Sequence, residues 1–538
     1  MTRFLHLREW AAGVILLSVL WCLFSCKSAV ENDENLIFRY NESANITSLD
    51  PAFAKTQSNI WACNQLFNGL VQLNNRLEIT PDIAHHWEIS IDGLTYTFYL
   101  REDVYFHEHP NFGNQKTRKV TAFDFEYSLN RLLNERLASP GRWIIQNVKH
   151  FKALNHTTFE VQLHQAFPGF LGLMTMKYAS VVPKEICDDP NVDFRSNPIG
   201  TGPFYAKLWV ENTKLVLRKH QYYHEKDASG QALPYLEAIA IRFLPDKQSG
   251  FMEFLQGKID FISGIDASYK DALLTQKGEL KAPYDEKFLM LTSPYLNTEY
   301  LGFRPDLNPV LADKRIRQAL NYGFDRSQLV LYLRNNIGTP AHHGMIPVGL
   351  PGGGLAKGYR FDFEKAKTLI QNYEKEKGKV PRLRLQTNAS YADMGEFLQQ
   401  AWRKLGLVVE VDVNPPSTLR QAISTGKADF FRASWIADYP DAENYLSLFY
   451  SKNKAPNGPN YTHFENKTFD NLYEKAMRTT DMDERIKLYA QMDELIVEEA
   501  YVIPLFYDQV VRFAQKNIHG LETNALNLLQ LKFVQKKK

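Results

Sequence analysis

Hydrophobic and polar positions alternate in several segments of the first third of the chain, as half-buried strands require. The segments 94–100 (LTYTFYL) and 157–163 (TTFEVQL) carry this pattern, and a turn signal, SIDG, precedes the first. Between them, 121–134 (TAFDFEYSLNRLLN) starts at a threonine that can cap a helix, and its apolar residues share one helical face. The N-terminal third is therefore predicted to combine strands and turns with at least one amphipathic helix.

After about residue 295 the pattern changes to helical stretches separated by short strand-like runs. Helical stretches are predicted at 313–333, 361–378, 394–406 and 483–500, and strands at 382–387, 407–414 and 428–435. Such an alternation is typical of an α/β domain with a partly parallel sheet. The segment from residue 501 onward is strand-like again, so we expect it to return to an earlier sheet.

The composition limits the classes of function. The chain has 538 residues, enough for several domains, with 44% hydrophobic and 23% charged residues, as in soluble globular proteins. The net charge is only +2. No strongly basic domain is present, and we expect no nucleic-acid partner.

The N-terminus has the pattern of a secretion signal. Arg3 and Arg8 precede the uncharged run 11–24, which is too short to span a membrane comfortably. The motif LFSC, ending at Cys26, resembles the bacterial lipobox, in which the cysteine is lipidated. We therefore expect a signal peptide over 1–25, lipidation of Cys26, and a polar tether. The alternative is an ordinary signal peptide with a chance cysteine.

Two further cysteines, Cys63 and Cys187, would remain in the mature protein. They either form a disulfide in an oxidising compartment or stay as buried thiols, and the sequence leaves both readings open.

Catalytic and cofactor motifs are not apparent. The Gly-rich run 352–358 lacks the Lys-Ser/Thr pair of a phosphate-binding loop, and the paired histidines lack the HExxH spacing of a zinc site. No GxSxG motif occurs. We therefore expect no cofactor and no metal, and a binding protein rather than an enzyme.

From Leu36 to the C-terminus the chain resembles the oligopeptide-binding proteins of ABC importers, within the peptide/nickel class of bacterial extracellular solute-binding proteins. The resemblance rests on segments in similar order, among them ITSLDPAFA, LFNGLVQLN, PDIAHHWEISIDGLTYTFYLREDVYF, NPIGTGPF, FLQGKIDF, DKRIRQALNYGFDRSQL and FFRASWIADYPDAENYL. It implies a bilobed, clam-shell periplasmic-binding-protein fold of α/β class, type II-like, with an extra inserted domain.

The resemblance also implies how the chain is divided. The expected order is a tether (26–35), lobe I in three segments (36–68, 196–295 and 508–538), an inserted small domain (69–195) and lobe II (296–507). Two crossover strands, near 296–302 and 503–509, would form a hinge.

In this family the aspartate of the matching W-x-A-D-Y segment pairs with the α-ammonium of a peptide, which implies that role for Asp438. The strand around Ser434 and Ile436 would pair with the peptide backbone. Trp435 and Tyr439 would supply flat apolar walls, and Arg432 matches an arginine that can meet a peptide carboxylate.

Each of these residues has a structural alternative: Asp438 as a turn acid before Pro440, Trp435 as a core residue, and Arg432 as a structural cation. The chain also departs from its relatives. Asn45 stands where a close relative carries an acid in the binding region, and GRW replaces an expected aromatic near residue 140, so Trp143 is one candidate to fill that place.

The expected function is therefore a lipid-anchored, monomeric receptor in the periplasm or cell envelope, which binds short extended peptides and delivers them to an ABC permease. Two alternatives remain. The same fold could bind another solute, such as a metal chelate, haem or an oligosaccharide, or the protein could act as a sensory receptor or an enzyme.

Overall fold

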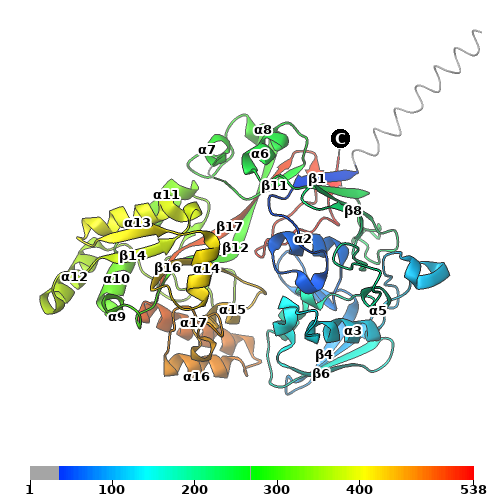
Figure 1. Ribbon diagram of the computed structural model, residues 1–538, viewed down its shortest axis with the longest axis horizontal. Helices are drawn as coiled ribbons and strands as arrows, with labels where there is room; N and C mark the ends of the chain where they lie inside the picture. Colours follow the sequence, from blue (N-terminus) through cyan, green and yellow to red (C-terminus); the bar gives the residue numbers. More distant parts are fainter. Residues whose placement is uncertain (1–35, 267, 538) are drawn as a thin grey trace, which may run out of the picture.

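The computed structural model describes residues 36–266 and 268–537, which form two lobes (Figure 1). The predicted bilobed α/β fold is confirmed. The predicted signal peptide, Cys26 and the tether lie outside the described residues. No helix in the described part of the chain has the length and apolar character needed to cross a bilayer.

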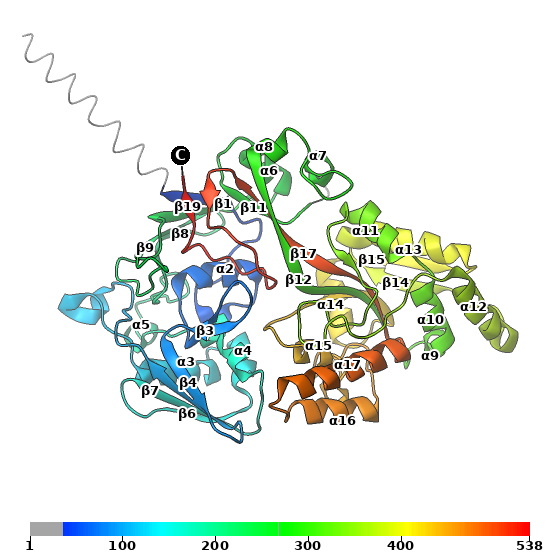
Figure 2. The ribbon, with the colours of Figure 1, turned by 180° about the vertical axis from the view of Figure 1, so that it is seen from behind.

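Two long antiparallel strands join the lobes: β12 (Phe288–Phe303) and β17 (Val502–Gln515). Figure 2 shows them passing from one lobe to the other. They include the two segments predicted as crossover strands. Their pairing shifts register between Pro294 and Thr298, and again between Glu299 and Tyr300. Such irregularities weaken the ladder locally, so the middle of the strand pair is suited to bending.

One sheet runs through both lobes in the order β15-β14-β16-β12-β17-β11-β1-β10-β9-β8, with β13 beside β17. The lobe I part contains β1 (Ile37–Asn41), β8 (Phe204–Val210), β9 (Lys214–Lys219), β10 (Ala238–Arg242) and β11 (Phe261–Ser263). Strands β1 and β10 are parallel, and β11 pairs antiparallel with β17, so the chain does return to an early sheet. Helices α2 (Gln57–Leu66) and α6 (Lys247–Leu255) belong to the same lobe.

The region between β3 and β8 carries a separate four-stranded antiparallel sheet, ordered β4-β5-β7-β6. Its elements are β4 (Ala84–Ile89), β5 (Thr95–Leu100), α3 (Ala122–Leu133), β6 (Val148–Ala153) and β7 (Thr158–Leu163). The predicted strands and the capped helix of this part are confirmed. The domain boundaries expected from the resemblance stay predictions.

Lobe II contains β14 (Leu383–Thr387), β15 (Val409–Val413) and β16 (Phe430–Ile436), with parallel pairing of β14 to both neighbours. Its longer helices are α10 (Lys314–Tyr322), α11 (Arg326–Arg334), α12 (Phe363–Lys377), α13 (Ala392–Lys404), α14 (Pro416–Ser424), α16 (Lys467–Ala476) and α17 (Met482–Glu499).

One helix prediction was wrong in its continuity. The stretch 313–333 forms two helices, because α10 ends at Gly323 and Asp325 then caps α11. The carboxylate of Asp325 accepts a hydrogen bond from the Ser327 N–H at 2.8 Å, which starts the new helix in a new direction.

The remaining elements are short. They are η1 (Pro51–Phe53), β2 (Val71–Leu73), β3 (Ile79–Pro81), η2 (Pro110–Gln115), η3 (Pro140–Ile145), α4 (Phe170–Met174), η4 (Lys177–Ala179), α5 (Lys184–Cys187), α7 (Lys270–Leu273), α8 (Tyr284–Lys287), α9 (Pro309–Ala312), β13 (Thr339–Pro340), η5 (Ala389–Tyr391), α15 (Glu443–Leu446), η6 (Ser451–Asn453), β18 (Ile518–His519) and β19 (Gln535–Lys536).

Cys63 and Cys187 are free thiols, Cys63 being buried and Cys187 partly buried. Of the two readings that the sequence left open, the structure has the unbridged one.

Candidate ligand-binding cleft

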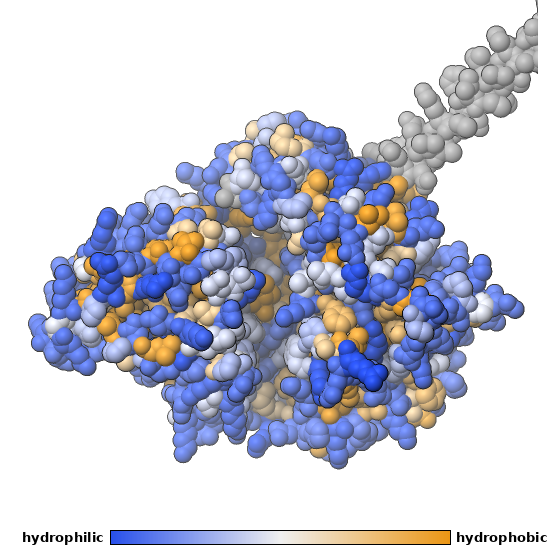
Figure 3. Space-filling model, in the orientation of Figure 1, coloured by the Kyte–Doolittle hydropathy of each residue, from blue (hydrophilic) through white to orange (hydrophobic). Residues whose placement is uncertain are grey.

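A recess separates the two lobes in the space-filling view (Figure 3). Within it lies a cavity with about 210 Å³ accessible to the centre of a water molecule. Both lobes and the hinge contribute to its walls. The lining residues are Ala54, Lys55, Gln57, Ile60, Trp61, Leu73, Thr175, Met176, Lys177, Tyr178, Tyr295, Ile436, Ala437, Asp438, Leu526, Asn527 and Leu528.

The lobe II wall of this cavity is the end of β16. On one side β16 pairs antiparallel with β12, from Asn297–Ile436 to Phe303–Phe430. On the other side β14 pairs with β16 only at Gln386–Phe431. The last residues of β16 therefore have one edge that no described strand covers.

The direction of the backbone groups at this edge follows from the ladder. The N–H of Ala437 donates to the carbonyl of Leu296 at 2.9 Å, toward β12. Because successive residues of a strand direct their backbone groups to opposite edges, Ser434 and Ile436 direct theirs to the uncovered edge. These two residues were predicted to pair with a peptide, and their backbone is placed for it.

Asp438 follows β16 directly and lines the cavity. Its side chain reaches solvent through the cleft, and among the described residues no basic group lies at ion-pairing distance from it. The surrounding protein raises the pKa of its carboxyl by desolvation, and a hydrogen bond from Asn444 acts in the opposite direction. An unpaired carboxylate in this setting is suited to a ligand cation.

Asn444, in α15, positions this end of the strand, although nothing in the sequence marks it as a site residue. Its Oδ1 accepts from the Trp435 Nε1–H at 2.8 Å and from the Asp438 backbone N–H at 3.2 Å. Its Nδ2 donates to Asp438 Oδ2 at 3.4 Å. An amide six residues after an aspartate gives no recognisable motif, so only the fold reveals the contact.

The two acids that follow Asp438 in the sequence, Asp441 and Glu443, have partners inside lobe II. Asp441 accepts a hydrogen bond from the Tyr489 hydroxyl at 2.7 Å and lies 3.5 Å from Arg485. Glu443 is buried and accepts from the hydroxyls of Tyr439 and Tyr473. Both acids are therefore structural.

Arg432 also has its charged partner within the protein. Its guanidinium pairs with the carboxylate of Glu299 on β12, and both residues are buried. The ring of Tyr391 lies 3.4 Å from its Cζ. Burial raises the pKa of Glu299, and the Arg432 charge opposes that shift. Because Glu299 already neutralises the arginine, the predicted contact of Arg432 with a peptide carboxylate gains no support from this geometry and stays a prediction.

Three other predicted residues do not line the cavity. Trp435 packs partly buried within lobe II, on the opposite face of β16 from Ile436. Tyr439 is buried against the other lobe: a Cβ at Gly172 would come within 3.2 Å of its ring. Asn45 is exposed outside the cavity lining. Their predicted roles as ligand contacts gain no support from this arrangement.

The lobe I wall consists of residues that the sequence did not single out. Trp61 is buried, and its indole N–H donates to the Asn527 carbonyl at 2.7 Å. Tyr178 faces Asp438: burial raises the pKa of its hydroxyl to about 12, and the Asp438 charge adds to that shift. Lys177, beside Tyr178, lines the same cavity.

Gly141 explains the position of Tyr178. A Cβ at residue 141 would lie only 2.4 Å from the Tyr178 ring, so only glycine leaves room for it. Trp143, the candidate aromatic from the GRW segment, is 37% exposed and lies outside the cavity lining. The aromatic wall near residue 140 is therefore supplied by Tyr178.

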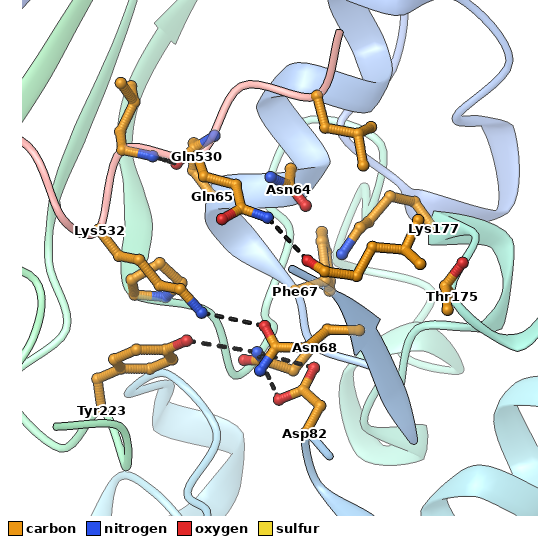
Figure 4. Close-up of a pocket in the computed structure, with 15 residues that line it drawn as sticks. Asn64, Gln65, Phe67, Asn68, Asp82, Thr175, Lys177, Tyr223, Gln530 and Lys532 are labelled. Carbon is orange, nitrogen blue, oxygen red and sulfur yellow. Dashed lines mark hydrogen bonds between the residues drawn. The ribbon is translucent and has the colours of Figure 1, made fainter. Parts of the chain in front are cut away.

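A second, more polar cavity adjoins the first, sharing Leu73, Thr175, Lys177 and Leu528 with it (Figure 4). Its charged groups are mostly paired. Lys532 donates to Glu225 at 2.6 Å, and His224 lies 3.6 Å from Asp82. Asp82, His224 and Glu225 are close enough together to ligate a cation, but Lys532 and neighbouring amides already bond the two carboxylates.

Comparison with known proteins places these features in a family. Residues 78–457 match the model described as bacterial extracellular solute-binding proteins, family 5 Middle. The chain belongs to this family. The match covers well over half of the chain, and the clam-shell fold with a cleft between lobes agrees with it.

Two curated relatives are similar over most of their length. The dipeptide-binding protein of Escherichia coli (strain K12) is 24% identical over 486 residues, covering 86% of this chain and 87% of that protein. The glutathione-binding protein GsiB of Escherichia coli O6:K15:H31 (strain 536 / UPEC) is 25% identical over 518 residues, covering 95% of both.

Among solved structures, the periplasmic binding protein DppA of Helicobacter pylori, in complex with the peptide STSA, superposes with a TM-score of 0.77. It is 23% identical, and the match covers 95% of this chain and all of that one. At this identity the likeness establishes the fold.

Proposed function

We propose that this protein is the substrate-binding component of an ABC importer, that it binds short peptides between its lobes and delivers them to a permease, and that it catalyses no reaction. The observation that carries the proposal is Asp438, whose carboxylate has no cationic partner among the described residues and lies at the end of a strand edge in the cleft. One similar protein is named for binding dipeptides, and another was solved in complex with the peptide STSA.

The binding mode follows from the two features together. The α-ammonium of the peptide would pair with Asp438, and the peptide backbone would add to the uncovered edge at Ser434 and Ile436. Backbone pairing is indifferent to side-chain identity, so this mode suits a receptor for many sequences. Closure of the lobes about β12 and β17 would cover the ligand.

We further propose that the mature protein starts at a lipidated Cys26 and acts as a monomer in the periplasm or cell envelope. The motif LFSC and the preceding uncharged run support this part of the proposal. Mass spectrometry of the protein expressed with its own leader tests it: a mature N-terminus other than a lipid-modified Cys26 would refute the anchor.

Native mass spectrometry of residues 27–538, purified without denaturation, tests the cargo. We expect a set of small adducts that dissociate and sequence as mixed short peptides. A metal, haem or carbohydrate mass in their place would favour another cargo. Because a weak ligand can be lost in purification, titration calorimetry with Ala-Ala and Ala-Ala-Ala accompanies it, and no binding in that titration would contradict the proposal.

A further inference from the structure

The cavity at Asp438 is also lined by a cation that forms no ion pair with the described residues. Lys177 lines the cavity from η4 of the opposite lobe, and no carboxylate of the described residues lies at ion-pairing distance from its amine. Desolvation lowers the pKa of this amine, and the more distant Asp82 acts in the opposite direction. Burying an ammonium without an anion is unfavourable, so the position is suited to an anion supplied from outside the protein.

The other donors around Lys177 are already used. In the adjoining cavity, Asn64 Nδ2 donates to the Leu529 carbonyl at 2.8 Å, and Thr175 Oγ1 donates to the Gly172 carbonyl at 2.7 Å. Lys532 bonds Glu225 and Gln72 at 2.6 and 3.0 Å. Figure 4 shows Lys177 directed into this cavity from the side opposite Lys532. Among these donors of the described residues, the Lys177 ammonium is the one without a hydrogen-bonded acceptor, so it can donate to an incoming anion.

Lys177 and Asp438 reach this cavity from opposite lobes. Both line the cavity, and Tyr178, the neighbour of Lys177, is close enough to Asp438 for the aspartate charge to raise the pKa of its hydroxyl. The carboxylate of Asp438 on one lobe and the ammonium of Lys177 on the other are complementary to a ligand that carries a positive and a negative charge close together. Such a ligand would also hold the two lobes together.

We propose that Lys177 binds a carboxylate of the same peptide whose ammonium pairs with Asp438, and that the protein therefore prefers ligands with a carboxylate within one or two residues of the N-terminus. This inference rests on the proposed function. The carboxylate has two possible sources: the side chain of an acidic first residue, or the C-terminus of a dipeptide.

Three peptides distinguish these sources in titration calorimetry: Ala-Ala, Ala-Ala-amide and Glu-Ala-amide. The wild-type protein should bind one or both carboxylate-bearing peptides roughly 10- to 100-fold more tightly than Ala-Ala-amide, as expected for one charge-assisted hydrogen bond. A preference for Ala-Ala identifies the C-terminal carboxylate, and a preference for Glu-Ala-amide identifies the side chain.

The variant Lys177→Met should abolish that preference and leave the affinity for Ala-Ala-amide within about threefold, while Lys177→Arg should retain it in part. Because no carboxylate in the described part of the chain pairs with the lysine, Lys177→Met should fold with an unchanged or higher melting temperature; a structural lysine would give a lower one. Lys207→Met, which removes an exposed lysine on β8 far along lobe I, is the matched charge control.

Lys55 is the alternative residue that could bind the ligand carboxylate, since it also lines the cavity, at an exposed position. If Lys55→Met removes the preference and Lys177→Met does not, the assignment to Lys177 is wrong. If the wild-type protein binds all three peptides equally, the inference fails and the proposed function stands. If it binds none of them, nor Ala-Ala-Ala, the proposed function itself fails.

Discussion

Arg432 and Asp438 were both predicted to contact the ligand, but their surroundings are opposite. Arg432 lies within the strand, buried and paired with Glu299 under the Tyr391 ring. Asp438 follows the strand, and its carboxylate is open to the cleft, with no cation of the described residues paired to it. This comparison shows that a charged residue near a cleft indicates a ligand contact only where the protein supplies no opposite charge to pair with it.

The largest effect is expected from breaking the ion pair between Arg432 and Glu299. Arg432→Met should lower the free energy of unfolding by about 3–5 kcal/mol, because Glu299 would be left as an uncompensated buried charge. Peptide affinity of the folded fraction should change less than about threefold. Urea denaturation and calorimetry measure the two quantities.

The double variant Arg432→Met/Glu299→Gln is the control for that prediction, since it removes both charges and should recover part of the stability. A loss of affinity of about 100-fold with unchanged stability in Arg432→Met would instead make Arg432 a ligand residue.

Peptide binding at Asp438 should depend on Asn444, the residue that orients this carboxylate. Asn444→Ala removes the hydrogen bonds to Asp438, so peptide affinity should fall roughly 10-fold. Asn466→Ala is the matched control: it removes the cap of α16, where Asn466 accepts from the Thr468 N–H at 2.9 Å. That variant should lose similar stability without losing affinity. Equal affinities in both variants would exclude a positioning role for Asn444.

The uncovered edge gives a smaller effect. Ile436→Pro removes an N–H that the ladder with β12 does not use, so the protein should stay folded while peptide affinity falls about 3- to 10-fold. Ile436→Val keeps the N–H and should behave as wild type. Unchanged affinity in the proline variant would argue against backbone pairing at this residue.

The smallest effect near neutral pH concerns protonation. A bound ammonium favours ionised Asp438, whereas the pKa of this carboxyl is raised in the free protein. Affinity should therefore be complete above that pKa and fall as the pH falls through it, with proton release on binding. Calorimetry in buffers of different ionisation enthalpy measures the release, and Asp438→Asn should show none from this group.

Local patterns were sufficient for much of the fold. The alternation at 94–100, the helix at 361–378 and the two crossover strands appear where the sequence placed them, because each has its own periodicity or family signature. The break at Gly323 was missed because the apolar pattern continues across it, although Asp325 is a good cap.

The site was predictable only in part. Asp438 and the edge at Ser434 and Ile436 follow from one contiguous segment. Lys177 and Tyr178 lie more than 200 residues away in sequence and reach the cleft through tertiary packing, with Gly141 making the room. Partners also decide the outcome: Arg432 is satisfied by Glu299, and no local pattern indicates that pairing.

The proposed function depends most on Asp438 binding the α-ammonium of the ligand. A thermodynamic cycle tests it most directly, with wild type and Asp438→Asn each titrated with Ala-Ala-Ala and with its N-acetylated form. Wild type should bind the free peptide more tightly by roughly 30-fold or more, and the variant should bind both forms alike. If Asp438→Asn keeps the wild-type preference for the free amine, Asp438 does not bind the α-ammonium.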